Sequence, residues 1–169
     1  SMQWILDEPS SAAVLYDVKQ AKSDKKALQK LIDEVIGNVV NEHYFSYLFD
    51  KQGNKVKYSA KPQNYGMKSS GAQVLYYFDF MLSKPQLLQD NEFTLSTYDP
   101  TYYVSMYYDK PFHSAVDFSQ LPENCHGEVL EPNINEKLKA YASSLDQSQR
   151  NEDDTLGAQF AQKVRLICR

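Results

Sequence analysis

Residues 23–43, SDKKALQKLIDEVIGNVVNEH, carry the pattern that most constrains the fold. Apolar side chains recur at helical spacing on one face of this segment, while charged and amide side chains occupy the other face. The apolar positions are Leu28, Leu31, Ile32, Val35, Ile36, Val39 and Val40. Ser23 belongs to a residue type that often caps a helix, so we expect a helix over residues 24–42. A helix with one apolar face needs a surface to cover, and a β-sheet is the expected partner.

Segments of alternating or aromatic-rich sequence predict that sheet. Strands are expected within residues 3–8, 43–60, 72–83, 91–99, 101–109 and 163–168, with a turn over residues 50–54 inside the second of these. Short helices are expected at 9–21 and 132–145, a helical turn at 157–162, and loops at 61–72 and 146–154. The pattern predicts one α+β domain over residues 1–169, in which an antiparallel sheet carries the long helix on one face.

Residues 98–109, YDPTYYVSMYYD, contain five tyrosines and are expected to form one of the strands. Alternation along a strand places Tyr102, Val104, Met106 and Tyr108 on one face and Tyr103, Ser105, Tyr107 and Asp109 on the other. We predict that the first set is buried and that the second faces solvent or a partner. Exposed aromatic side chains are enriched at protein interfaces, so Tyr103 and Tyr107 are candidate partner-binding residues.

Charge and motifs exclude several functional classes. The formal net charge is −4 and the basic residues are dispersed, which argues against nucleic-acid binding. There is no glycine-rich phosphate loop, no GxSxG nucleophile motif and no HExxH helix, so we expect a protein that is not an enzyme.

The two cysteines, Cys125 and Cys168, do not belong to a CxxC pair, which excludes a four-cysteine zinc site. Each lies in or beside a short alternating segment, so the two residues are expected on strands that could be neighbours. They are either two buried free thiols or a disulfide that fixes the C-terminal strand. We predict the disulfide, which would indicate an oxidising compartment.

The histidines His43, His113 and His126 are isolated in the sequence, a pattern more typical of surface or capping residues than of metal ligands. Asp99 precedes a proline, where an aspartate commonly organises a turn. Asp7 and Glu8 follow an apolar strand and are expected either at the surface or facing a cleft. From the residues alone, structural roles are the simpler interpretation.

Several motifs nevertheless resemble a known family: WILDE, NVVNEHYFSYLF, AKPQNYG, YYFDFMLSKP and above all TYDPTYYVSMYYD. They are similar to bacterial periplasmic proteins described as the periplasmic component of an uncharacterised ABC-type transport system. Members are typically encoded beside permeases of the nickel/cobalt type, and some such pairs serve zinc acquisition. The resemblance covers nearly the whole chain.

The resemblance implies a periplasmic accessory component of a zinc or nickel/cobalt transport system, which handles the metal or docks on its permease. His43, Asp99, Asp7 and Glu8 fall on family motif positions and become candidate ligands of zinc or another divalent metal. Family members usually begin with a His-Pro-His strand after a signal peptide, so we expect both segments to precede the residues present here. The alternative function is a metal-independent interaction module of the cell envelope that uses the tyrosine-rich face.

Overall fold

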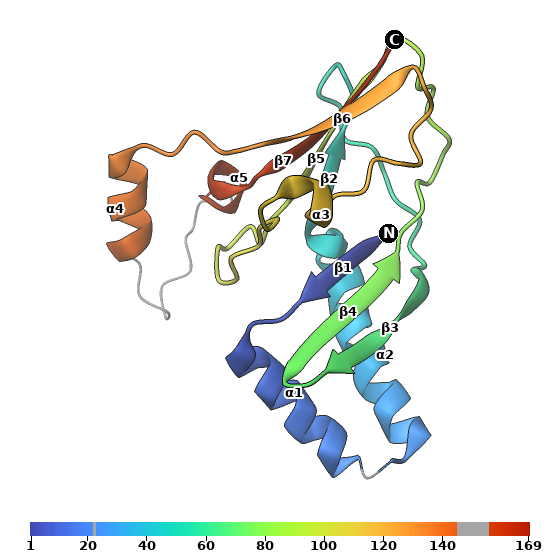
Figure 1. Cartoon of the computed structure of the whole chain (residues 1–169), viewed down its shortest axis with the longest axis vertical. Helices are drawn as coiled ribbons and strands as arrows, with labels where there is room; N and C mark the ends of the chain where they lie inside the picture. Colours follow the sequence, from blue (N-terminus) through green and yellow to red (C-terminus); the bar gives the residue numbers. More distant parts are fainter. Residues whose placement is uncertain (22, 145–155) are drawn as a thin grey trace. The chain divides into compact units, whose positions relative to one another are not determined.

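The computed structural model describes residues 1–21, 23–144 and 156–169 and has an α+β fold, as predicted. The chain divides into two compact units, which Figure 1 shows in sequence colours. Unit 1 comprises Ser1–Tyr44 and Lys57–Lys84, and unit 2 comprises Phe45–Val56 and Pro85–Arg169. Each unit has its own antiparallel sheet, so the strands are antiparallel as predicted but belong to two sheets rather than one.

The sheet of unit 1 has the strand order β1-β4-β3, formed by Met2–Ile5, Gln73–Asp79 and Gln63–Ser70. Its central strand β4 alternates buried and partly exposed residues and supplies Val74, Tyr76 and Phe78 to the core. The strand β3 corrects the prediction of a loop over residues 61–72. Most of its side chains are polar and exposed, because β3 is an edge strand in which only Met67 packs against the core while Gly66 is covered by the Tyr77 side chain, and its apolar alternation is therefore weak.

Two helices complete unit 1: α1 over Glu8–Gln20 and α2 over Lys25–Asn41. The helix α2 confirms the amphipathic prediction and lies against the sheet (Figure 1). Its buried residues Ile32, Ile36 and Val39 share one core cluster with Tyr44 and Phe78. Asp24 rather than Ser23 caps α2, since the Asp24 carboxylate accepts hydrogen bonds from the N–H groups of Lys26 and Ala27.

The sheet of unit 2 has the order β2-β5-β7-β6, formed by Ser46–Phe49, Glu92–Thr97, Lys163–Cys168 and Cys125–Leu130. The expected turn after β2 is present, because Asp50 N–H donates to the Asn54 carbonyl and the Asp50 carboxylate accepts from Gln52 and Asn54. The second strand expected beyond this turn is reduced to two isolated bridges, Lys55 with Phe49 and Tyr58 with Leu82.

Three short helices belong to unit 2: α3 over Phe112–Ala115, α4 over Glu136–Ser144 and α5 over Leu156–Phe160. The helices α4 and α5 match the expected helices at 132–145 and 157–162, whereas α3 has no counterpart in the sequence prediction. The polar loop predicted at 146–154 lies outside the described residues. Within the described part of the chain, no helix is both long and apolar enough to cross a membrane.

Candidate functional site

The tyrosine-rich segment forms a loop over residues 98–111, which we call the tyrosine loop. No strand forms anywhere in these residues, all of which the structure describes, so the prediction of a strand at 101–109 is wrong. The chain turns immediately after Pro100: Tyr102 adopts a left-handed backbone conformation with φ of 55°, and its N–H donates to the Asp99 carbonyl. A left-handed residue at this point breaks the extended conformation that strand alternation requires.

Asp99 organises the first half of the tyrosine loop. Its Oδ1 accepts hydrogen bonds from the N–H and the hydroxyl of Thr101, both at 2.8 Å, and its Oδ2 accepts from Val104 N–H at 3.1 Å. The side chain is 7% exposed. Gly157 lies against this turn so closely that a Cβ atom there would overlap the Asp99 carbonyl oxygen. Asp99 therefore serves as the turn-organising residue expected before a proline.

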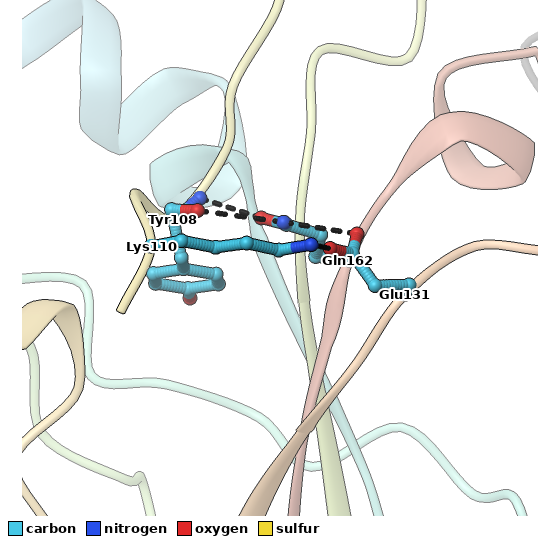
Figure 2. Close-up of polar contacts among 4 residues, drawn as sticks. All are labelled: Tyr108, Lys110, Glu131 and Gln162. Carbon is cyan, nitrogen blue, oxygen red and sulfur yellow. Dashed lines mark hydrogen bonds and ion pairs between the residues drawn. The ribbon is translucent and has the colours of Figure 1, made fainter. Parts of the chain in front are cut away.

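A second anchor holds the other end of the tyrosine loop, and Figure 2 shows its four residues. Gln162, just before β7, accepts a hydrogen bond from Tyr108 N–H and donates to the Tyr108 carbonyl at 3.4 Å. The same amide donates to Glu131 at 3.2 Å, and Lys110 forms an ion pair with Glu131 at 2.8 Å. The hydrogen bonds from Lys110 and Gln162 lower the pKa of Glu131 below its usual value. Glu131 is thus held in its anionic form.

Two aromatic side chains of the loop point inward. The Tyr108 hydroxyl lies 3.3 Å from the Thr97 hydroxyl on β5, and burial raises the pKa of Tyr108 above its usual value. The ring of Tyr102 stacks on Phe160 of α5 with their centroids 4.7 Å apart. These contacts attach the tyrosine loop to β5 and α5 of unit 2.

Tyr103 and Tyr107 point the other way, with exposed fractions of 78% and 72%. The predicted outward position of Tyr103 and Tyr107 is therefore confirmed, but Tyr102 and Tyr108 are only partly buried rather than in the core. Turns rather than strand alternation produce this division. Val104 departs from the prediction, since it is 48% exposed instead of buried. Its backbone is held by the hydrogen bond from its N–H to the Asp99 carboxylate, while its side chain is exposed. Exposed aromatic and aliphatic groups thus share a loop that is anchored at both ends.

A cavity of about 270 Å³ lies beside the tyrosine loop within unit 2. Its aromatic and thioether lining consists of Tyr98, Tyr102, Tyr107, Phe160 and Met106. Its acidic lining residues are Asp99 and Glu131. No sequence pattern pointed to Glu131, Gln162 or Gly157, because they lie in no motif and are 21 to 58 residues from their partners.

The residues proposed as metal ligands have separate local roles. In unit 1, Asp7 caps α1, since its Oδ1 accepts a hydrogen bond from Ser10 N–H at 2.8 Å. Hydrogen bonding from the Ser10 side chain, and then from its N–H, lowers the pKa of Asp7. Glu8 is exposed in the first turn of α1. His43 stacks on Tyr58 with ring centroids 5.0 Å apart and follows α2 with φ of 56°. Asp99 belongs to unit 2.

Among the described residues, no group of three or more His, Cys, Asp or Glu side chains lies in positions that could hold one metal ion. The other two histidines are exposed, His113 on α3 and His126 on β6. Zinc or other metal binding through His43, Asp7, Glu8 and Asp99 therefore stays a prediction that rests on the resemblance.

Cys125 and Cys168 form a disulfide, which confirms the predicted pairing and excludes two free thiols. They are directly opposite each other on the neighbouring strands β6 and β7. The bond closes the last strand of the chain onto the edge strand of the sheet. Disulfides persist in oxidising compartments, so this pair is compatible with an extracytoplasmic location.

Comparison with known proteins assigns the chain to a family. A family model described as a protein of unknown function, DUF1007, matches residues 1–168. The chain belongs to this family. An uncharacterised protein of Haemophilus influenzae is 60% identical over 168 residues, which cover 99% of this chain and 80% of that protein. No solved structure matches the chain.

Proposed function

We propose that this DUF1007 protein is a periplasmic, non-enzymatic accessory component of a divalent-cation transport system that docks on the system's permease through the tyrosine loop. The observation that carries the proposal is the outward position of Tyr103 and Tyr107 on a loop fixed at both ends. The disulfide supports the compartment. The resemblance to periplasmic partners of nickel/cobalt-type permeases supports the nature of the partner and its cargo, zinc or nickel/cobalt.

The physical argument concerns the cost of ordering an interface. Binding through a flexible loop loses affinity because the loop must become ordered, whereas an anchored loop has already lost that freedom. Here Asp99 holds one end of the loop and Gln162 the other. Tyrosine adds a large contact area with few rotatable bonds, which is why tyrosine is frequent among the residues that dominate binding energy. The tyrosine loop combines both properties.

The test is to measure binding of the chain to the purified permease in nanodiscs, together with uptake of radioactive zinc and nickel in cells. The double variant Tyr103→Ser/Tyr107→Ser is expected to weaken binding by 10-fold or more and to reduce uptake, because hot-spot truncations cost about 2 kcal/mol or more. Its unfolding midpoint is expected to stay near that of the wild type, since both side chains are exposed.

Tyr16→Ser provides the matched control, because Tyr16 is 64% exposed on α1 of unit 1. This variant loses the same phenol group from a residue that does not belong to the tyrosine loop and should retain binding and uptake. Equal losses for the control and the double variant would overturn the proposed role of the loop. Normal binding and uptake by the double variant would do the same.

Handling of the metal by the chain itself is the part of the expected function that depends on His43, Asp7, Glu8 and Asp99. Calorimetric titration with zinc and with nickel tests it directly, using His43→Ala as the comparison. Loss of a measurable binding heat in His43→Ala would support a ligand role for this histidine. Equal heats in both proteins would remove His43 from the ligand set.

A further inference from the structure

We propose that the cavity beside the tyrosine loop is a binding site for a basic side chain, a guanidinium or ammonium group, presented by the docking partner. This inference rests on the proposed docking function and identifies the chemistry that the docking surface recognises. The cavity is formed within unit 2 and has a volume of about 270 Å³, which is sufficient for the end of one long side chain.

Charge complementarity is the first argument. The described lining residues include two acids, Asp99 and Glu131, and contain no Lys, Arg or His. Glu131 is at the surface, and its hydrogen bonds keep it anionic. An anionic ligand would therefore meet repulsion at the cavity, and a neutral ligand could gain no more than a hydrogen bond at Glu131, without charge attraction. A cation gains from the carboxylate field.

The aromatic lining is the second argument. The aromatic residues Tyr98, Tyr102, Tyr107 and Phe160 line the cavity together with Met106. Aromatic faces attract cations, and a guanidinium group also stacks on them through its planar surface. Tyr102 is held in place by its stack on Phe160, so part of this lining is rigid before a ligand arrives. An arginine side chain can stack on an aromatic ring and form an ion pair with the Glu131 carboxylate.

An internal cation already uses part of the site. Lys110 donates to Glu131 Oε1 at 2.8 Å, but the Lys110 side chain is 70% exposed. A pair this exposed is weak, so an incoming guanidinium can replace the ammonium group at Glu131 at little cost. The two residues of the pair should therefore respond in opposite directions to mutation. Removal of Glu131 takes away the attraction, whereas removal of Lys110 takes away a competitor.

The experiment is an NMR titration of the isotopically labelled chain with N-acetyl-L-arginine amide. N-acetyl-L-citrulline amide is the control, because it has the same shape without the charge. The arginine probe is expected to shift the amide signals of Tyr107, Tyr108 and Gln162 in a saturable way. The citrulline probe should bind about three- to fivefold more weakly or not detectably, a ratio typical of an exposed charge contact. Equal affinities for the two probes would overturn the proposal.

Three substitutions sharpen the test. Glu131→Gln should weaken binding of the arginine probe about three- to fivefold, while Lys110→Met should strengthen it about twofold. Glu128→Gln is the matched control, since Glu128 is also a partly exposed acid in an ion pair, with Arg165 on β7, and lies outside the cavity lining. A purely structural role for the Lys110–Glu131 pair predicts weaker binding for both Glu131→Gln and Lys110→Met, and that result would overturn the proposal.

Tyr107→Leu keeps the test decisive if Glu131→Gln disturbs the loop, because Tyr107 is 72% exposed and its removal leaves the Gln162 anchor intact. It should weaken binding of the arginine probe about twofold or more. If the arginine probe does not bind the wild type but Tyr103→Ser/Tyr107→Ser still weakens binding to the permease, the cavity proposal fails and the proposed docking function is retained. If the arginine probe binds but substitutions of the tyrosines and of Glu131 leave binding to the permease unchanged, the docking function fails and the cation site is retained.

Discussion

Replacement of Asp99 distinguishes a residue that shapes the tyrosine loop from one that binds metal. Asp99→Asn keeps the shape of the side chain and one acceptor oxygen, which can still serve Thr101. The new amide N–H₂ group then faces Val104 N–H, so one hydrogen bond is lost and two donors oppose each other. Because Asp99 is only 7% exposed, water compensates poorly, and we expect a cost of about 1 to 3 kcal/mol.

Asp99→Ala removes all three hydrogen bonds and should cost more, about 2 to 4 kcal/mol. Hydrogen–deuterium exchange measured by mass spectrometry locates the effect. A loss of about 2 kcal/mol in local opening free energy accelerates exchange about 30-fold, and the change should be largest in peptides covering residues 98–108. The single tryptophan, Trp4, belongs to unit 1, so its fluorescence would not report this change directly.

Asp117→Asn is the matched control, because the Asp117 carboxylate also accepts a turn hydrogen bond, from Ser119 N–H at 2.8 Å, but at an exposed site. Its exchange pattern should remain close to that of the wild type. Unchanged exchange over residues 98–108 in both Asp99 variants would refute the anchoring role of this carboxylate. Zinc-dependent protection of these peptides in the wild type, absent in Asp99→Asn, would instead support Asp99 as a ligand.

Three further predictions concern the stability of the units. Ile32→Asp places a carboxylate in the core cluster that contains Phe78, and should lower the free energy of unfolding by several kcal/mol. The urea midpoint followed by Trp4 fluorescence should therefore fall sharply, since Trp4 packs on Phe78. An unchanged midpoint would contradict the packing of α2. Cys125→Ser/Cys168→Ser removes a covalent link between residues 43 positions apart and should lower the free energy of unfolding of unit 2 by about 4 kcal/mol, measured by chemical denaturation. Two alkylatable thiols in the denatured, unreduced wild type would disprove the disulfide itself. Burial raises the pKa of Tyr108, so the folded chain retains this proton longer than the unfolded chain and stability falls as the pH rises above about 10. Tyr108→Phe should make the fall of the urea midpoint with rising pH less steep, and an identical slope would count against the buried position of this phenol.

Local sequence patterns predicted those elements whose stability comes from one continuous face. The helix α2 was predictable because its apolar residues recur at the helical period over 17 residues. The strands β4, β5 and β7 were predictable because each is rich in apolar or β-branched residues. Cys125 and Cys168 were correctly expected in two such segments, but their pairing also required that β6 and β7 be neighbours.

The failures occurred where a contact distant in sequence determines the conformation. The strand β3 is polar and exposed, and it is a strand because β4 offers an edge on which its backbone can form hydrogen bonds. The separation of β4 and β5 into two sheets likewise depends on which strands meet, and alternation within a strand contains no information about its neighbour.

The tyrosine loop shows both sides of this distinction. The sequence by itself determined that an aspartate before proline would organise a turn. It predicted the exposure of Tyr103 and Tyr107 correctly, but from a strand alternation that this segment does not have. Only the tertiary structure decided that the segment is a loop, because Gln162 and Phe160 supply its anchors from more than 50 residues away. Tyrosine favours strands locally, but the hydrogen bonds collected by Asp99 and Gln162 are satisfied only when the segment folds back. The cavity and its acidic lining arise from the same long-range contacts, and for that reason no local sequence pattern predicted them.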